Sequence, residues 1–393
     1  MSAAAAATAA ARDGQTALAL RLVKHLAPPE DSAAGGNVAF SPVSLHAALA
    51  LLTAGARGAT QAQLLAFLGA PSAAELAKFG RGVAHRVVVD RADSGGPRPE
   101  EAVTMINDWV EKATDGLIKT MISTADIDAQ TDLVLANAVY FMGKWLEPFH
   151  THNTRRLAFH CLNGSRTTPV TMSMYRKKLH VACMEGFKVL KLPYQAGARQ
   201  LAQGQHKRRR GLNGDAASST AITDSPDADG EDTQYSMFIF LPDTLDGITT
   251  MVDVITSSPA FMYGVLAEMK EELIDLQLPK FEITFNWAKL EDTLRGMGLS
   301  LPFSRKAADL RDMFKENDVT ELRTFVGKAA HTAVVKVDEK GTEAAAATMF
   351  MCGGGGPLQE PLKFIADHPF TFFIMEEQSG VIVFAGHVLD PTK

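Results

Sequence analysis

The sequence predicts an α+β fold with mostly antiparallel sheets. Helical patterns occupy the first third of the chain, and runs rich in Val, Ile and Phe dominate the remainder. A regular strand–helix–strand alternation, which would indicate a parallel sheet, is not seen. With 393 residues, of which 46% are hydrophobic and 21% charged, the composition is that of an ordinary globular protein.

The early helices are predicted from spacing and from terminal residues. Leucines recur at helical spacing within residues 16–26, and Ser41 followed by Pro42 has the form of an N-cap and first helical residue. The Ala-rich residues 1–15 lack the basic start and leucine core of a secretory signal, so we expect a disordered tail there. The predicted helices are 16–26, 42–54, 60–68, 106–118 and, between later strands, 290–298.

Strands are predicted where β-branched and aromatic residues cluster between turn residues. Residues 199–234 differ sharply, because they are rich in Gly, Asn, Ser, Asp and Pro, and we expect a disordered surface insertion. Its basic run, Lys207 to Arg210, is a solvated charge run, with a nuclear signal or protease-sensitive site as the alternatives. The predicted strands are 133–141, 187–194, 235–242, 273–285, 331–338, 369–376 and 380–390.

Charge and cysteine content exclude several classes of function. The formal net charge of −6 argues against a general nucleic-acid or anionic-membrane partner, and no apolar run reaches the length of a membrane span. The three cysteines have no pattern typical of disulfides or metal ligands, which favours a reducing compartment. We therefore expect a cytoplasmic protein without cofactor or metal, and leave extracellular and organellar locations open.

Several strings of the sequence together resemble one family. These are NVAFSPVSLHAALALLTAGARGAT (37–60), INDWVEKATDGLI (106–118), LVLANAVYFMGKW (133–145), FKVLKLPY, SMFIFLPD, LPKFEITF, HTAVVKVDEKGTEAAAAT (331–348), FIADHPFTFFI (364–374) and GVIVFAGHVLDP (380–391). In this order they resemble the serpins, and the plant branch in particular. The resemblance implies a single serpin domain over residues 16–393 that acts as a monomer, with an exposed reactive-centre loop at 341–363.

The resemblance also implies a mechanism. A serpin offers its loop to a protease as a substrate, and after cleavage the upstream half inserts as a new strand in a large sheet. The attached protease is carried across the molecule and its acyl-enzyme is distorted. Insertion is downhill because roughly a dozen ladder hydrogen bonds, each worth about 1 kcal/mol net, form at once.

The stretch that would insert has suitable residues. Alanine is small enough to enter between two strands without overpacking, and it is a poor strand former, so the uncut loop is not driven into the sheet. Alternation would point Thr342, Ala344, Ala346, Thr348 and Phe350 inward. The implied loop hinge consists of Glu339, Gly341, Thr342, Glu343, Ala344, Ala345, Ala346, Ala347 and Thr348.

Four polar residues are expected where the sheet parts. Ser41, Ser44, Asn137 and His331 could suggest a nucleophile–base pair, but no G-x-S-x-G motif is present. We therefore expect no enzyme. The resemblance instead places the four as a buried hydrogen-bond cluster that controls sheet opening, because each orphaned polar group would cost about 1–3 kcal/mol.

Two departures from the family pattern stand out. Between residues 93–97 and the helix at 106–118, a strand, a helix and a second strand, about forty residues in all, are missing. One edge of the large sheet is therefore expected to be truncated. The second departure is the scissile bond, which the family pattern places between Gly355 and Gly356.

Glycine at the scissile position restricts the target. It offers no side chain to the protease's main specificity pocket, which excludes trypsin-like enzymes. The predicted function is therefore suicide-substrate inhibition of a small-pocket serine protease or of a cysteine protease. The alternative is a non-inhibitory serpin-fold binding protein or degenerate copy, which the missing segment and the glycine bond favour.

Overall fold

The structure of the protein, a computed structural model, describes ten stretches of the chain. The side chains of 3–11, 88–91, 99 and 113 are not described. The described residues are 3–29, 36–77, 88–91, 99–114, 116–127, 133–141, 143–195, 234–313, 324–340 and 360–393. The predicted insertion, except Gln234, and the predicted loop from 341 to 359 lie outside them.

The N-terminal helix α1 (Ala3–His25) corrects one prediction. The Ala-rich stretch expected to be disordered is helical from Ala3 onward. Alanine has the highest intrinsic helix propensity, and the helix is anchored further along by the buried Gln15. The Gln15 side chain donates to the Ile382 carbonyl at 2.9 Å and accepts from the Ile382 amide at 3.3 Å.

Helices α2, α3 and α8 lie close to their predicted positions, α5 is displaced, and α6 and α7 were not predicted. α2 (Pro42–Gly55) begins as expected, with the Ser41 hydroxyl accepting from the Ser44 amide at 3.4 Å. Helix α5 (Pro99–Ala113) starts earlier than predicted and ends sooner, with proline in its first turn and Lys112 in its last. The other helices are α3 (Gly58–Leu68), α6 (Ile248–Ile255), α7 (Pro259–Ala267) and α8 (Leu290–Gly296), with short 3-10 turns η1 (Thr151–Asn153), η2 (Leu301–Phe303) and η3 (Arg311–Met313).

The larger sheet has the order β1-β15-β14-β9-β8-β7-β10-β13, with β4 paired to β7. All its pairings are antiparallel except β10 with β13. Its strands are β1 (Val38–Phe40), β4 (Arg155–Arg156), β7 (Val170–Met184), β8 (Phe187–Pro193), β9 (Tyr235–Pro242), β10 (Lys270–Pro279), β13 (Leu362–Ile365), β14 (Phe370–Glu376) and β15 (Ile382–Val388). The loop predicted to end at 363 therefore ends sooner, since β13 begins at Leu362.

The second sheet contains four strands in the described residues, in the order β11-β12-β3-β2. They are β11 (Phe281–Asn286), β12 (Val326–Val337), β3 (Leu133–Phe141) and β2 (Val88–Arg91). The single strand predicted at 273–285 is thus two strands, β10 and β11, which belong to different sheets. The chain turns between them around Pro279 and Lys280, a break that the continuous apolar pattern conceals. A third, two-stranded ladder joins β5 (Phe159–His160) to β6 (Arg166–Thr167).

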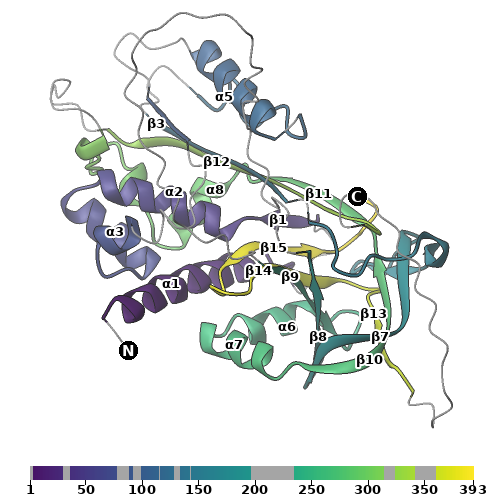
Figure 1. Cartoon of the computed structure of the whole chain (residues 1–393). Helices are drawn as coiled ribbons and strands as arrows, with labels where there is room; N and C mark the ends of the chain where they lie inside the picture. Colours follow the sequence, from purple (N-terminus) through teal and green to yellow (C-terminus); the bar gives the residue numbers. More distant parts are fainter. Residues whose placement is uncertain are drawn as a thin grey trace, which may run out of the picture.

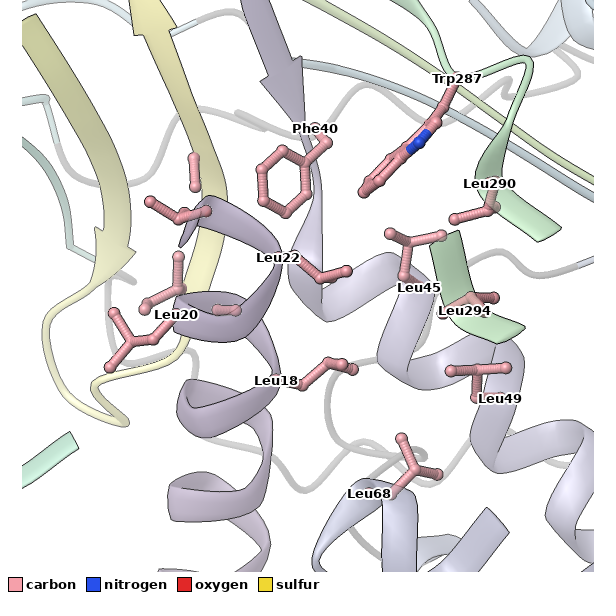
Figure 2. Packing of buried hydrophobic residues seen from close by; sticks show 14 of the residues in the cluster. Leu18, Leu20, Leu22, Phe40, Leu45, Leu49, Leu68, Trp287, Leu290 and Leu294 are labelled. Carbon is pink, nitrogen blue, oxygen red and sulfur yellow. The ribbon is translucent and has the colours of Figure 1, made fainter. Parts of the chain in front are cut away.

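Helices cover both faces of the four-stranded sheet (Figure 1). On one face α5 and the segment after it pack against β3 and β12 through Val110, Ile122, Val134 and Val334. On the opposite face lie α2 and α8, with α1 packed on the far side of α2. Figure 2 shows the leucines of these helices converging, with Leu18 and Leu22 of α1 near Leu45 of α2. The sheet is thereby held between two apolar layers.

Candidate functional site: the seam between strands β3 and β12

The strands expected to flank an inserting loop lie side by side. β12 pairs with β3 in a continuous parallel register that runs from Lys328 opposite Val134 to Val335 opposite Phe141. On their outer sides both strands pair antiparallel, β12 with β11 and β3 with β2. We call the β3–β12 contact the seam. It is the one parallel pairing among the described strands of this sheet.

The four residues predicted to control sheet opening meet at the middle of the seam. Asn137 and His331 are register partners across it, and the Asn137 Oδ1 lies 3.2 Å from the His331 Nδ1. The Ser44 hydroxyl donates to the Asn137 Oδ1 at 2.6 Å, and the Asn137 amide nitrogen donates to the Ser44 carbonyl at 3.2 Å. The Ser41 amide donates to the His331 Nε2 at 3.1 Å. The start of α2 therefore clamps both strands together.

These bonds determine the tautomer of His331. Because the Ser41 backbone N–H can only donate, Nε2 must be the unprotonated nitrogen. The proton is then on Nδ1, which donates to the Asn137 carbonyl oxygen. The ring is completely buried, and this desolvation lowers the pKa of His331 to about 3, so it stays neutral near pH 7.

A second group of bonds closes the seam at the end from which the loop departs. The Trp145 indole N–H donates to the Asp338 carbonyl at 2.9 Å, and its backbone N–H donates to the Lys340 carbonyl at 3.3 Å. The Phe149 amide donates to the Glu339 carbonyl at 2.8 Å. Trp145 is itself held by stacking on Tyr194, with ring centroids 4.4 Å apart. The segment after β3 is therefore tied to the segment after β12.

The hinge residue Glu339 adds an ion pair at this end. Its carboxylate lies 2.8 Å from the ammonium of Lys280, and its side chain is only 13% exposed. Burial by itself would raise the pKa of Glu339, but the hydrogen bond and charge of Lys280 outweigh it and hold the pKa below its ordinary value. Lys280 lies at the turn between β10 and β11, so the hinge is bonded to both sheets.

The opposite end of the seam carries another ion pair. The Lys328 ammonium of β12 donates to the Asp126 carboxylate at 2.5 Å. Asp126 lies in the connection between α5 and β3, and its hydrogen bonds from Lys328 and Ser123 lower its pKa to about 2. The seam is thus fastened at both ends and at its centre.

The sequence predicted the central cluster and Glu339, but not the other residues that hold the ends of the seam closed. Trp145 and Lys280 stand inside strings that carried the family resemblance, yet neither periodicity nor composition marks them. The pair Asp126–Lys328 joins residues 202 positions apart, which no local pattern reveals. The predicted hinge from Gly341 to Thr348 and the bond Gly355–Gly356 lie outside the described residues.

The described residues contain no cluster of three or more His, Cys, Asp or Glu side chains suited to a metal ion. Among them, no helix is both long and apolar enough to cross a bilayer.

Comparison with known proteins decides the family. The family model described as "Serpin (serine protease inhibitor)" matches residues 13–94, 96–202 and 230–391. The chain belongs to the serpins. It is therefore a protease inhibitor by family, with the serpin fold and the α+β class that the sequence predicted.

Its similar relatives are plant serpins. The chain is 38% identical to Serpin-Z2B of Oryza sativa subsp. japonica, over 97% of each protein, and 35% identical to Serpin-Z4 of Hordeum vulgare, over 96% of the chain and 95% of that protein. Among solved structures it is similar to native AtSerpin1 of Arabidopsis, with TM-score 0.75, 26% identity and coverage of 98% and 99%. Uncleaved ovalbumin, at 20% identity and TM-score 0.69, shares the fold.

The alignment with a plant relative contains positions that this chain lacks. The alignment with Serpin-Z2B runs over 418 positions, more than the 393 residues of this serpin, so at least 25 positions of it have no counterpart here. The edge of the seam sheet is nonetheless occupied in part. Strand β2 pairs with β3 over four residues, Val88–Arg91, so β3 is not itself the edge strand.

Proposed function

We propose that this serpin inhibits a serine protease with a small specificity pocket, or a cysteine protease, by inserting its cleaved loop between β3 and β12. The single observation that carries the proposal is the parallel pairing at the seam. A segment that follows β12 and folds back beside it must run antiparallel to β12. Since β3 is parallel to β12, that segment also runs antiparallel to β3.

Insertion therefore exchanges one parallel contact for two antiparallel ones. Parallel pairs are slightly less stable per residue than antiparallel pairs, and the number of strand contacts doubles. The strands on either side must separate from about 4.8 Å to about twice that distance, which breaks the Asn137–His331 bond. The new ladder, at roughly 1 kcal/mol for each of about a dozen bonds, offsets this loss.

The target class rests on the residues of the loop. A reactive bond at Gly355–Gly356 gives the protease no side chain to hold in its main pocket. Elastase-like and subtilisin-like serine proteases accept small residues, and some cysteine proteases select at neighbouring positions instead. We expect inhibition of such enzymes to be slow, because four consecutive glycines increase the entropy lost on docking.

The decisive experiment mixes the purified serpin with a protease panel and separates the products on a denaturing gel. We expect a covalent complex with at least one small-pocket enzyme and none with trypsin. Two loop variants give a matched control, because alternation places Ala346 inward and Ala347 outward. Ala346→Arg should convert inhibitor into cleaved substrate, while Ala347→Arg should still form complex. Clean cleavage of the unaltered serpin by every enzyme, with protease activity retained, would contradict inhibition.

A further inference from the structure

One segment of this acidic protein is strongly basic. Residues 148–184 contain six Arg or Lys residues, four histidines and no Asp or Glu, whereas the whole chain has a net charge of −6. The segment includes β4, β5, β6 and β7, which form a hairpin followed by a long strand. We call residues 154–171 the cationic hairpin.

Within the hairpin, three arginines are exposed. Arg155 and Arg156 of β4 lie opposite Thr171 and Val170 of β7, and in a separate antiparallel ladder His160 of β5 lies opposite Arg166 of β6. As directly opposite residues of an antiparallel pair, His160 and Arg166 place their side chains on the same face of the β5–β6 ladder. The Arg156 guanidinium donates to the Thr168 carbonyl at 3.2 Å, which holds it against the hairpin.

The charge of these arginines is not neutralised within the described part of the chain. Other cations of the segment are paired: Lys177 lies 2.7 Å from Glu147 and Lys178 lies 3.4 Å from Glu271. None of the ion pairs in the described residues includes Arg155, Arg156 or Arg166.

Two carboxylates that contact the hairpin have partners of their own among the described residues. Asp367 lies 2.8 Å from the His368 Nδ1, and Glu339 lies 2.8 Å from the Lys280 ammonium. The hairpin therefore presents uncompensated positive charge to solvent.

The hairpin also lies between the two points at which the reactive loop leaves and rejoins the described structure. Glu339, one residue before the chain leaves the described part, accepts from the Phe149 amide. Asp367, just after the chain returns through β13, accepts from the His160 amide at 2.7 Å. Residues 149–160 thus connect the point where the loop departs to the point where it returns. Because the loop is tethered at these two points, a protease bound to it is held within the loop's reach of this stretch.

We propose that the cationic hairpin is an accessory docking surface for the target protease, and that it selects enzymes that carry carboxylates beside their active-site cleft. This rests on the proposed function, because the protease must first bind the reactive loop as a substrate. Arginine pairs with carboxylates through two parallel hydrogen bonds, and unlike charges near an interface chiefly raise the association rate. The hairpin supplies the selectivity that glycines at the reactive bond cannot.

The test uses subtilisin in two forms that differ in surface charge. Acetylation converts its lysines from positive to neutral, and succinylation converts them from positive to negative. The quantity measured is the second-order rate constant for loss of intact serpin, with covalent complex and cleaved product counted together. This rate reports docking whether or not the protease is subsequently trapped.

We expect succinylated subtilisin to consume the serpin roughly tenfold faster than acetylated subtilisin at about 0.02 M salt, and the advantage to shrink at about 0.15 M. The triple variant Arg155→Glu, Arg156→Glu, Arg166→Glu should lose this preference or reverse it. The control, with the same charge change at exposed lysines outside the cationic hairpin, should keep it. The control substitutions are Lys112→Glu, Lys119→Glu and Lys289→Glu.

Equal preferences in the two triple variants would overturn the docking proposal. The proposal would also be overturned if the unaltered serpin bound a heparin column but consumed succinylated and acetylated subtilisin at nearly equal rates. That result would indicate a polyanion as the partner of the hairpin. The corresponding Arg→Gln triple variant should show an intermediate loss, and matched thermal unfolding curves exclude misfolding as the cause. Failure of the proposed inhibitory function gives a different result: the serpin is cleaved without forming a covalent complex, whatever the rate at which it is consumed.

Discussion

His331 is a neutral imidazole kept in the core of the seam by its surroundings. Burial lowers its pKa from 6.5 to about 3, and His46 and His387, also buried, have pKa values lowered to about 4. The unfolded chain therefore binds more protons than the folded one between about pH 6.5 and pH 3–4. By linkage, the free energy of unfolding falls as the pH falls through that window.

We expect each such histidine to contribute a slope of up to about 1.4 kcal/mol per pH unit in this window, and none above about pH 7. Denaturant unfolding measured from pH 7.5 to pH 4 checks this. A His331→Asn variant should be less stable at pH 7.5 and should show a shallower dependence, by about one proton. An unchanged slope in that variant would show that His331 does not titrate on unfolding.

Asn137 serves three bonds with one side chain. Asn137→Ala leaves the Ser44 hydroxyl and the His331 Nδ1–H without their acceptor, so we expect a loss of about 2–4 kcal/mol of stability. Chemical denaturation measures the loss, and we also expect faster hydrogen exchange in β3 and β12. A cost below about 0.5 kcal/mol would mean that the cluster does not hold the seam.

The neighbouring Thr332 offers the opposite case. Its buried hydroxyl has no hydrogen-bond partner among the described residues. Thr332→Val removes that orphaned group at nearly constant volume, so we expect a gain of about 1 kcal/mol. The measurement is the shift of the denaturation midpoint at unchanged slope, and a decrease would indicate that the hydroxyl is satisfied in solution.

At the scale of elements, the two ends of the seam have separate fasteners. Glu339→Lys would place two ammonium groups where an ion pair now lies, and should open the seam where the loop departs. We expect faster uptake of a synthetic peptide spanning residues 342–355, together with faster hydrogen exchange at Trp145. Glu339→Gln keeps the size of the side chain and should have a smaller effect in the same direction.

Asp126 and Lys328 fasten the end that an inserting loop reaches last. We expect Asp126→Asn to leave the initial rate of protease attack unchanged and to alter the partition between trapped complex and released, cleaved serpin. The stoichiometry of inhibition measures this partition. A change in attack rate with an unchanged stoichiometry would place the pair's effect at the loop instead.

The elements differ in how far the sequence predicts them. β3 has the predicted bounds because a nine-residue apolar run between turns has few other solutions. The break between β10 and β11 was missed because both sides of Lys280 read as strand, and only the geometry of two sheets separates them. Helix α1 starts thirteen residues before its predicted start, since alanines without an apolar stripe resemble a tail.

The site divides in the same way. Ser41, Ser44, Asn137 and His331 were named through family resemblance, and the structure brings them within hydrogen-bonding distance. The end fasteners were not found, because ion pairs between distant segments depend on the tertiary fold. The positive charge of the cationic hairpin can be read from the sequence. Its position between the points where the loop leaves and rejoins the described structure depends on the tertiary fold and cannot.

For the molecule as a whole, cleavage of the loop should be strongly stabilising. Roughly a dozen new ladder bonds at about 1 kcal/mol each, less the seam contacts broken, correspond to a rise of tens of degrees in the unfolding temperature. Calorimetry before and after limited proteolysis of the loop measures this. A cleaved form that unfolds at the same temperature would show that the loop does not insert.

The parallel contact of β3 and β12 finally implies a limited lifetime. A fold with a deeper minimum available to the same chain persists only as long as the barrier to that minimum stands. Insertion of the loop releases this free energy only once in each molecule, and heating or ageing can cause insertion with no protease present. The amount of active protein then depends on new synthesis, because a molecule that has inserted its loop does not return to the active form.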